Sequence, residues 1–149
     1  MIDNQNIIYC KDPDKDMINK ALVKIEESFG KKLISDYPSR AIEGIFYSQL
    51  ESCYAIISIL EGYTYLDKLS VMPKYRGKGV GKSLLEEVIT YYPHIVWRAS
   101  HNNPYNSFYK SYAHHNVYLD DWILYWVGYG ENEKEIMIQK IIETKPDFI

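Results

Sequence analysis

The segment from Leu69 to Leu85 constrains the fold of this chain more than any other part of the sequence. It runs from an apolar strand through a turn that contains Gly77, Gly79 and Gly81 into an amphipathic helix. Because glycine has no Cβ, the backbone can adopt positive φ and bring its N–H groups close to a ligand, while the helix directs its positive dipole end to the same place. The segment therefore predicts a site for an anion such as a pyrophosphate, held mainly by backbone amides.

Basic side chains surround this turn and make it locally positive. They are Lys74, Arg76, Lys78 and Lys82. The whole chain nevertheless carries a formal net charge of −3, and no long positive face of the kind that binds nucleic acids is visible. We therefore expect a small phosphate-bearing ligand and no nucleic-acid partner.

Glycine spacing separates three kinds of phosphate site. A dinucleotide fingerprint requires Gly-x-Gly-x-x-Gly, and here the third glycine comes one residue early. A P-loop needs glycine at position 76, where this chain has Arg76, although Gly81-Lys82-Ser83 matches its end. The remaining pattern, Arg-Gly-x-Gly-x-Gly after a strand that ends Val-x-Pro, resembles the coenzyme A loop of the GNAT superfamily of N-acetyltransferases.

This resemblance implies an α/β protein with the GNAT fold, in which helices flank a single mixed sheet whose central strands splay apart. It implies acetyl-CoA as the co-substrate. Val71 and its neighbours are expected to offer backbone groups to the acetyl carbonyl and the pantetheine arm. The expected cofactor-binding residues are Leu69, Val71, Arg76, Gly77, Lys78, Gly79, Val80, Gly81, Lys82 and Ser83.

Length and composition agree with one domain over residues 1–149. A chain of 149 residues, 46% of them hydrophobic, can bury an adequate core. Cys10 and Cys53 lack metal spacing and are too few for a disulfide framework, so we expect reduced thiols in a cytoplasmic protein. The N-terminus lacks a signal-peptide pattern, and the longest apolar stretch, Tyr54 to Leu60, is too short to span a bilayer. We expect no membrane association.

Hydrophobic periodicity predicts alternating strands and helices. Apolar residues at helical spacing predict helices over residues 16–29 and 80–91, after Pro104, and over about 131–142, where a charged helix covers the sheet. The first two predicted strands form an antiparallel hairpin around a polar turn. The predicted strands span residues 44–48, 53–60, 64–71, 95–99 and 122–127.

Segments around the loop narrow the resemblance. Tyr-Leu-Asp-Lys-Leu at 65–69 precedes Trp-Arg-Ala-Ser-His-Asn-Asn-Pro at 97–104, Phe-Tyr at 108–109 and Trp-Ile-Leu-Tyr-Trp at 122–126. With Ser-Phe-Gly-Lys-Lys-Leu at 28–33 and Asp36-Tyr37, these segments closely resemble the acetyltransferase domain of vertebrate-type N-acetylglutamate synthases and bifunctional synthase-kinases. The amino-acid-kinase domain that precedes this module in that family is missing, so we expect a free-standing version.

The resemblance implies acetyl transfer from acetyl-CoA to the α-amine of an amino acid, with glutamate the leading acceptor, by direct transfer in a ternary complex. The departing CoA thiolate needs a proton, and Tyr109 stands where the family places this acid. A tyrosine with an ordinary pKa of about 10 is protonated at neutral pH and can donate. Asn103 is the second catalytic candidate, able either to hold substrate or cofactor or to open the turn at Pro104.

In the family, Lys68 and the basic residues of a Trp-Arg-x-Arg segment hold the substrate carboxylates. Lys68 and Arg98 are present, but Ser100 takes the place of the second arginine. One bidentate carboxylate partner is therefore absent, which predicts modest selection for glutamate. The next residue, His101, could supply a positive charge or a base in place of the missing arginine. Alternatively, it is an ordinary loop residue that forms hydrogen bonds. The adjacent histidines His114 and His115 lack a third metal ligand at a useful spacing, so we predict no metal site there.

The identity of the general base stays open between Asp67 and an ordered water relay. Strand alternation predicts that Asp67 and Lys68 point to opposite faces of the sheet. Two alternative functions also stay open: acetylation of another small amine, and a weakly catalytic acetyl-CoA-binding module that docks to a separate amino-acid-kinase protein. Besides a small-molecule amine acceptor, the expected partners are therefore such a kinase or a second copy of the chain.

Overall fold

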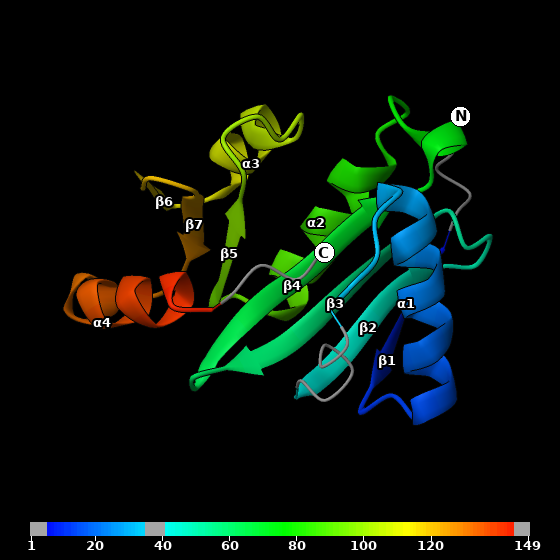
Figure 1. Cartoon of the computed structure of the whole chain (residues 1–149), viewed down its shortest axis with the longest axis horizontal. Coiled ribbons are helices and arrows are strands. Elements are labelled where there is room, and N and C mark those ends of the chain that lie inside the picture. Colours follow the sequence, from blue (N-terminus) through cyan, green and yellow to red (C-terminus); the bar gives the residue numbers. More distant parts are fainter. Residues whose placement is uncertain (1–5, 35–40, 145–149) are drawn as a thin grey trace.

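One seven-stranded mixed sheet with helices on both faces makes up the architecture of the computed structural model, which describes residues 6–34 and 41–144 (Figure 1). The strand order is β1-β2-β3-β4-β5-β7-β6. Neighbouring strands are antiparallel except β4 and β5, which are parallel. The strands are β1 (Ile7–Lys11), β2 (Ile42–Ser48), β3 (Cys53–Leu60), β4 (Tyr63–Val71), β5 (Ile95–Ala99), β6 (His115–Tyr118) and β7 (Ile123–Val127).

Helical segments alternate with these strands and agree with the predicted periodicities. A short 3₁₀ helix, η2 (Pro73–Tyr75), lies between β4 and the glycine turn. Strands β1 and β6 escape the sequence prediction because they are short edge strands, and β6 exposes most of its residues and so lacks an apolar pattern. Asp36 and Tyr37 lie outside the described residues. The helices are α1 (Lys15–Phe29), α2 (Val80–Tyr91), α3 (Asn106–Tyr112) and α4 (Glu131–Ile142).

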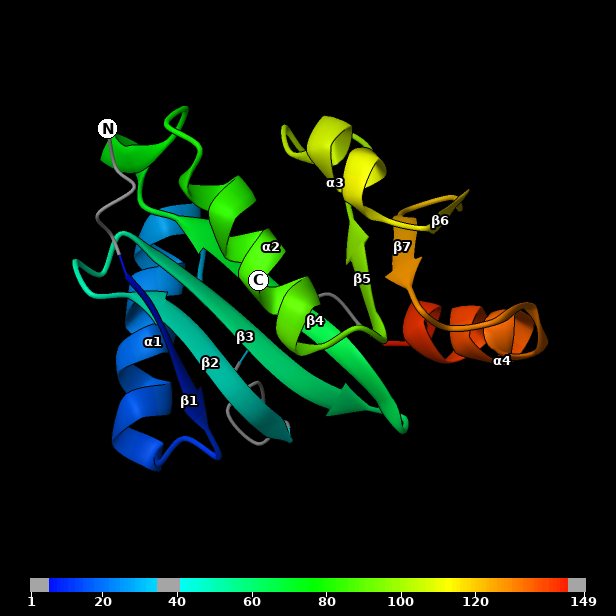
Figure 2. The ribbon, with the colours of Figure 1, turned by 180° about the vertical axis from the view of Figure 1, so that it is seen from behind.

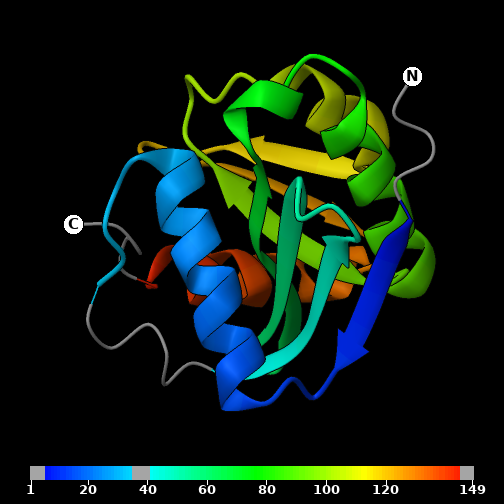
Figure 3. The ribbon, with the colours of Figure 1, turned by 90° about the vertical axis from the view of Figure 1, so that its right-hand side faces the viewer.

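Local signals at both ends define helix α1. Asp14 is the N-cap, and its side chain accepts a hydrogen bond of 2.8 Å from the backbone N–H of Met17. Gly30 ends the helix with φ of 66°, a left-handed conformation that favours glycine. This glycine turns the chain away from the helix axis, and the residues that follow run back alongside α1 (Figure 3).

Helices cover the sheet in two pairs. Figures 1 and 2 show α1 on one face and α2 on the other. Buried residues of α1 pack with β2 and β3, and those of α4 pack with β4, β5 and β7 on the same side. The other face carries the largest core cluster, where α2 and α3 pack on the central strands. Its helical members include Val80, Leu84, Leu85, Val88 and Tyr109.

Strands β4 and β5 separate in the middle of the sheet. They share one paired position, Tyr65 with Val96, and diverge beyond it (Figure 1). Two residues after this paired position, β4 contains a bulge: Leu66 pairs with Ile57 and Lys68 with Ile56, so Asp67 is the extra residue. The predicted splay of the central strands is therefore present, and it opens the sheet next to the glycine turn.

Two further observations concern sequence predictions. Both cysteines are free thiols, with Cys53 buried and Cys10 half-buried. Within residues 6–34 and 41–144, no helix is long and apolar enough to cross a membrane, and no group of three or more His, Cys, Asp or Glu residues could hold a metal ion.

Candidate active site

The glycine turn has the geometry that its sequence predicts at two of its three glycines. Gly77 and Gly79 have φ of 78° and 81°, and a Cβ at either would meet no heavy atom within 4 Å. Gly79 is also the N-cap of α2 and provides no side-chain cap. The first backbone N–H groups of α2 therefore have no acceptor within the helix and are available to an anion at the open surface of the turn.

Gly81 has a different role from the one predicted. It lies within α2 and has no positive φ. A Cβ at this position would lie 3.3 Å from Cγ2 of Val71 and 3.7 Å from ring carbons of Phe108 and Tyr105. The prediction that Gly81 frees the backbone is therefore wrong; its lack of a side chain lets α2 pack closely on β4 and α3.

A cavity of about 460 Å³ lies beside the turn. Its walls come from the end of β4, the turn itself, the segment before α3 and the last turn of α1. Gly77 and Arg76 lie at one end, and Leu69 and Val71 lie along the strand. Because Gly77 belongs to the lining, a ligand in this cavity would reach the glycine turn directly. Lys78, Lys82 and Ser83 are exposed nearby, whereas Val80 is buried in the core.

The carbonyl of Val71 is already engaged within the protein. It accepts hydrogen bonds from Nε of Arg76 at 2.9 Å and from the Ser28 hydroxyl at 3.0 Å. The Val71 carbonyl is therefore satisfied within the protein, and the contact of other backbone groups of Val71 and its neighbours with the acetyl carbonyl and the pantetheine arm stays a prediction. Arg76 contributes its guanidinium to the protein's own backbone.

A second cavity, of about 330 Å³, occupies the gap between the splayed strands. It brings together every predicted catalytic and substrate-binding residue: Lys68, Arg98, Ser100, Asn103 and Tyr109. It shares three lining residues with the cavity at the turn, so the two adjoin. The shared residues are Phe29, Leu69 and Asn103.

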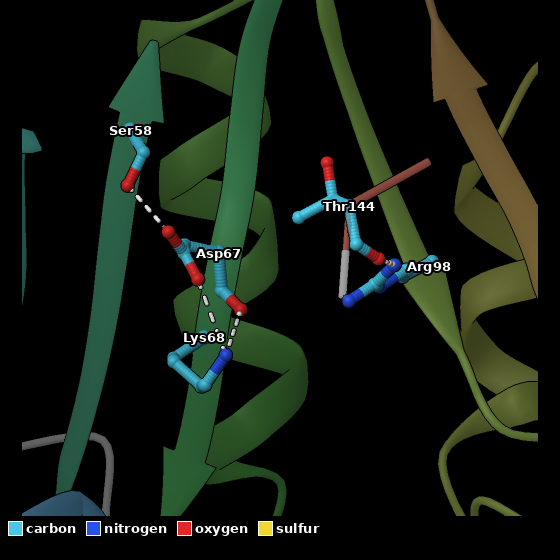
Figure 4. A network of polar contacts seen from close by, with 5 residues as sticks. All are labelled: Ser58, Asp67, Lys68, Arg98 and Thr144. Atoms are coloured by element: carbon cyan, nitrogen blue, oxygen red, sulfur yellow. Dashed lines mark hydrogen bonds and ion pairs between the residues drawn. The ribbon is translucent and has the colours of Figure 1, made fainter. Parts of the chain in front are cut away.

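Asp67 and Lys68 both line this second cavity, contrary to the prediction that they face apart. The bulge in β4 breaks the alternation of side chains. Lys68 Nζ lies 3.1 Å from Asp67 Oδ1 and donates to the Asp67 carbonyl at 3.0 Å, while the Ser58 hydroxyl donates to Asp67 Oδ2 at 2.5 Å (Figure 4). Both charged side chains are buried, so Lys68 meets the cavity with a carboxylate beside it.

Arg98 faces Lys68 across the gap and binds the end of helix α4 (Figure 4). Its Nη1 donates to the carbonyls of Thr144 at 2.6 Å and Ile141 at 3.3 Å, and its guanidinium lies 4.1 Å from the Trp122 ring centroid. A cation at the negative end of a helix is stabilised by the exposed carbonyls. Arg98 therefore anchors α4 while it lines the cavity.

Tyr109 lines the second cavity and packs between aromatic rings. Its side chain is 5% exposed, and its ring centroid lies 5.7 Å from that of Trp97 and 5.4 Å from that of Tyr125. Burial raises the pKa of the Tyr109 phenol above its ordinary value, with the neighbouring Tyr105 and Tyr125 adding to the effect. The hydroxyl therefore keeps its proton at neutral pH and can donate it.

Ser100, His101 and Asn103 precede α3, and their side chains form hydrogen bonds within the protein. Asn103 Oδ1 accepts from the Tyr105 N–H at 2.8 Å, which is the turn role, although the residue also lines both cavities. His101 Nε2 bonds the Leu119 carbonyl at 2.6 Å. The Ser100 hydroxyl donates to Asn102 Oδ1 at 2.9 Å.

Lys31 is a lining residue that the sequence prediction did not select. It follows Gly30 and enters the second cavity from the α1 side, opposite the β5 wall. Three basic side chains and one carboxylate thus surround this cavity. The family-like motif at residues 28–33 contains Lys31 and could have pointed to it. The spacing of residues in that motif does not show, however, that the chain after α1 reaches β4 and β5.

A family described as NAT, the N-acetyltransferase of N-acetylglutamate synthase, matches residues 10–144. The chain belongs to this family. This places it among acetyl-CoA-dependent N-acetyltransferases, as the glycine loop predicts. The acetylglutamate kinase of Xanthomonas campestris pv. campestris is 31% identical over 118 residues, which are 75% of this chain and 28% of that protein. The Xylella fastidiosa (strain Temecula1) acetylglutamate kinase is 31% identical over 70% of this chain and 25% of its own length.

This N-acetyltransferase therefore spans about a quarter of the length of the curated relatives that it matches. Solved structures show the same fold at low sequence identity. An acyl-CoA N-acyltransferase from Pseudomonas aeruginosa has a TM-score of 0.65 and 13% identity, over 84% of this chain and 100% of that one. YhhK of Escherichia coli, solved bound to coenzyme A, has a TM-score of 0.52 and 16% identity, over 84% and 99%. The predicted GNAT fold is confirmed.

Proposed function

We propose that this protein transfers the acetyl group of acetyl-CoA to the α-amine of an amino acid, with glutamate the leading acceptor, in a ternary complex. The observation that carries the proposal is the pair of adjoining cavities in the splayed sheet. One lies at the glycine turn, and the other contains Lys68, Arg98 and Lys31 together with Tyr109. Two ligands can occupy these cavities side by side, as direct transfer requires.

The chemistry assigns separate tasks to the residues of the cleft. The acceptor ammonium must lose a proton before its nitrogen can attack the thioester carbon, and the sulfur that leaves must gain one. Tyr109 is the donor that we assign to the second step, because its phenol is protonated and the residue lines the cavity. Lys68 and Lys31 attract carboxylates to the same cavity. Asp67 and an ordered water both remain candidates for the base.

The acceptor is tested by measuring CoA release with free amino acids and polyamines and by locating the new acetyl group by mass spectrometry. We expect glutamate to be acetylated on its α-nitrogen. Turnover with a polyamine and none with any amino acid would instead support the alternative of another small amine. Coenzyme A binding without turnover on any acceptor would favour the binding-module alternative.

Selection for glutamate over glutamine should be modest, because Ser100 brings no charge to the second carboxylate and its hydroxyl already donates to Asn102 Oδ1. Ser100→Arg should raise the ratio of kcat/KM for glutamate to that for glutamine by roughly tenfold, since a charge-assisted fork is about twice as strong as a neutral bond. Ser100→Ala is the matched control, because it removes the hydroxyl without adding charge. If the native enzyme already rejects glutamine strongly and the arginine changes nothing, other residues read the carboxylate.

Lys31 should contribute to acceptor binding from the opposite wall. Lys31→Ala should raise KM for glutamate by roughly three- to tenfold, within the range of a partly exposed ion pair, and change KM for glutamine less. The adjacent Lys32 is a close control, because it pairs with Glu26 at 3.8 Å and its side chain is 80% exposed. Equal effects of Lys31→Ala and Lys32→Ala would indicate general electrostatics instead of a specific contact.

A docking partner is the second candidate function. The relatives named acetylglutamate kinase match this chain over about a quarter of their length, which supports an association with an amino-acid kinase. Co-purification with a kinase of the same cell, and a change of CoA release on mixing, would establish it. A second copy of the chain as partner, the cytoplasmic location and the single-domain boundary at 1–149 stay predictions.

A further inference from the structure

Three segments meet at the side chain of Arg76: the glycine turn that carries it, the end of β4, and the last turn of α1. Nε of Arg76 donates to the Val71 carbonyl at 2.9 Å. Nη2 donates to the Ser28 carbonyl at 2.6 Å and lies 3.2 Å from the Ser28 hydroxyl. That hydroxyl donates in turn to the Val71 carbonyl at 3.0 Å. The bonds form a closed network of one guanidinium, one hydroxyl and two carbonyls.

The network depends on a buried partner. Ser28 is 6% exposed and Val71 is 2% exposed, although Arg76 itself is a surface residue. Buried polar groups are held by hydrogen bonds, and losing a partner leaves the other group unsatisfied. The planar fork of arginine reaches two carbonyls at once, which the single ammonium of lysine does not reproduce.

The same residues line one of the two ligand cavities. Ser28, Val71 and Arg76 line the cavity at the turn, and Phe29, the next residue of α1, lines both cavities. The position of the turn relative to α1 therefore sets the width of the first cavity.

We propose that Arg76 is a positioning residue, not a phosphate ligand: with Ser28 it fixes the glycine turn to α1 and β4 and so sets the shape of the acetyl-CoA cavity. This inference rests on the proposed function, because it takes acetyl-CoA as the ligand of the turn. Its consequence is specific. Arg76 should support coenzyme A affinity through the geometry of its guanidinium and not through its charge. The neutral residue Ser28 should support the same affinity, because it belongs to the same hydrogen-bond network.

The test measures coenzyme A affinity by calorimetry at low and high salt for the full chain and four variants. Arg76→Lys keeps the charge and removes the fork, Arg76→Gln removes both, and Ser28→Ala removes the buried hydroxyl. Lys78→Ala is the control for an exposed charge beside the turn. We expect Arg76→Lys and Ser28→Ala each to weaken binding by about three- to tenfold. Arg76→Gln should lower affinity equally at both salt concentrations, whereas the effect of Lys78→Ala should shrink at high salt.

A double variant that combines Ser28→Ala with Arg76→Lys should lose less than the product of the two single losses, because both changes break one network. Wild-type affinity in Arg76→Lys, together with a salt-dependent loss in Arg76→Gln, would overturn the proposal and make Arg76 a phosphate ligand. Unchanged affinity in Ser28→Ala would also overturn it. Thermal unfolding confirms that each variant is folded, and Ser28→Ala still decides the question if an Arg76 variant is not. A wild-type protein that binds no coenzyme A would remove the proposed function itself.

Discussion

Gly79→Val should weaken coenzyme A binding by about tenfold or more. Gly79 has φ of 81° and begins helix α2. A left-handed conformation costs an L-residue roughly 1–2 kcal/mol, and more for a β-branched one, and about 1.4 kcal/mol corresponds to tenfold in affinity. Because a Cβ would meet no heavy atom within 4 Å, the loss comes from backbone strain and not from a clash with the core. Valine would move the amides that face the ligand.

Calorimetry of coenzyme A binding measures this loss, with Gly130→Val as the matched control. Gly130 begins helix α4 with φ of −86°, has no heavy atom within 4 Å of its Cβ position, and lies away from the glycine turn. We expect the control to bind normally. Unchanged affinity in folded Gly79→Val protein would remove the anion site at this turn.

Tyr109→Phe should lower kcat by roughly ten- to ten-thousandfold while coenzyme A affinity stays near the wild-type value. The substitution keeps the ring that packs against Trp97 and Tyr125, so its effect reports on the hydroxyl. Because burial raises the pKa of this phenol, the acid stays protonated as the pH rises toward about 10. We therefore expect no loss of activity from Tyr109 ionisation in the neutral range.

Single-turnover measurements make the chemical step visible in this experiment. Tyr125→Phe is the control, because Tyr125 belongs to the same aromatic cluster and its hydroxyl bonds Asn106 Oδ1 at 3.0 Å. Removing the Tyr125 hydroxyl should lower the stability of the protein more than it lowers kcat. Wild-type kcat in Tyr109→Phe, under conditions where chemistry limits the rate, would assign the Tyr109 ring to packing alone.

Sequence was sufficient for features whose causes are local. Local causes determine the apolar spacing of α1 and α2, the positive φ of the glycines at 77 and 79, and the end of β4 before Pro73. Each of these features depends only on the residues concerned and on their neighbours in the chain. For this reason the main helices and strands, the glycine turn and the GNAT fold were predictable. The grouping of Lys68, Arg98, Ser100, Asn103 and Tyr109 around one cavity was predictable too, because the resemblance places motifs in order along the chain.

Other features depend on contacts between segments that are distant in sequence. Asp67 and Lys68 share a cavity because the pairing of β4 with β3 contains a bulge, and alternation alone predicts the opposite. Arg98 binds the carbonyls of Thr144, which lies more than forty residues later. Lys31 reaches the cavity only because α1 ends beside β4.

The sequence by itself thus determined which groups the chain carries: a glycine turn before a helix, a tyrosine predicted to be the acid, and basic residues predicted to bind the acceptor. Only the tertiary structure decided how these groups are used. Arg76, which the sequence presents as a charge for phosphate, gives its fork to Ser28 and Val71, and Lys68 faces the acceptor cavity beside Asp67. The physical reason is that a charged side chain binds whatever acceptor the fold brings within reach, and that acceptor comes from another segment of the chain.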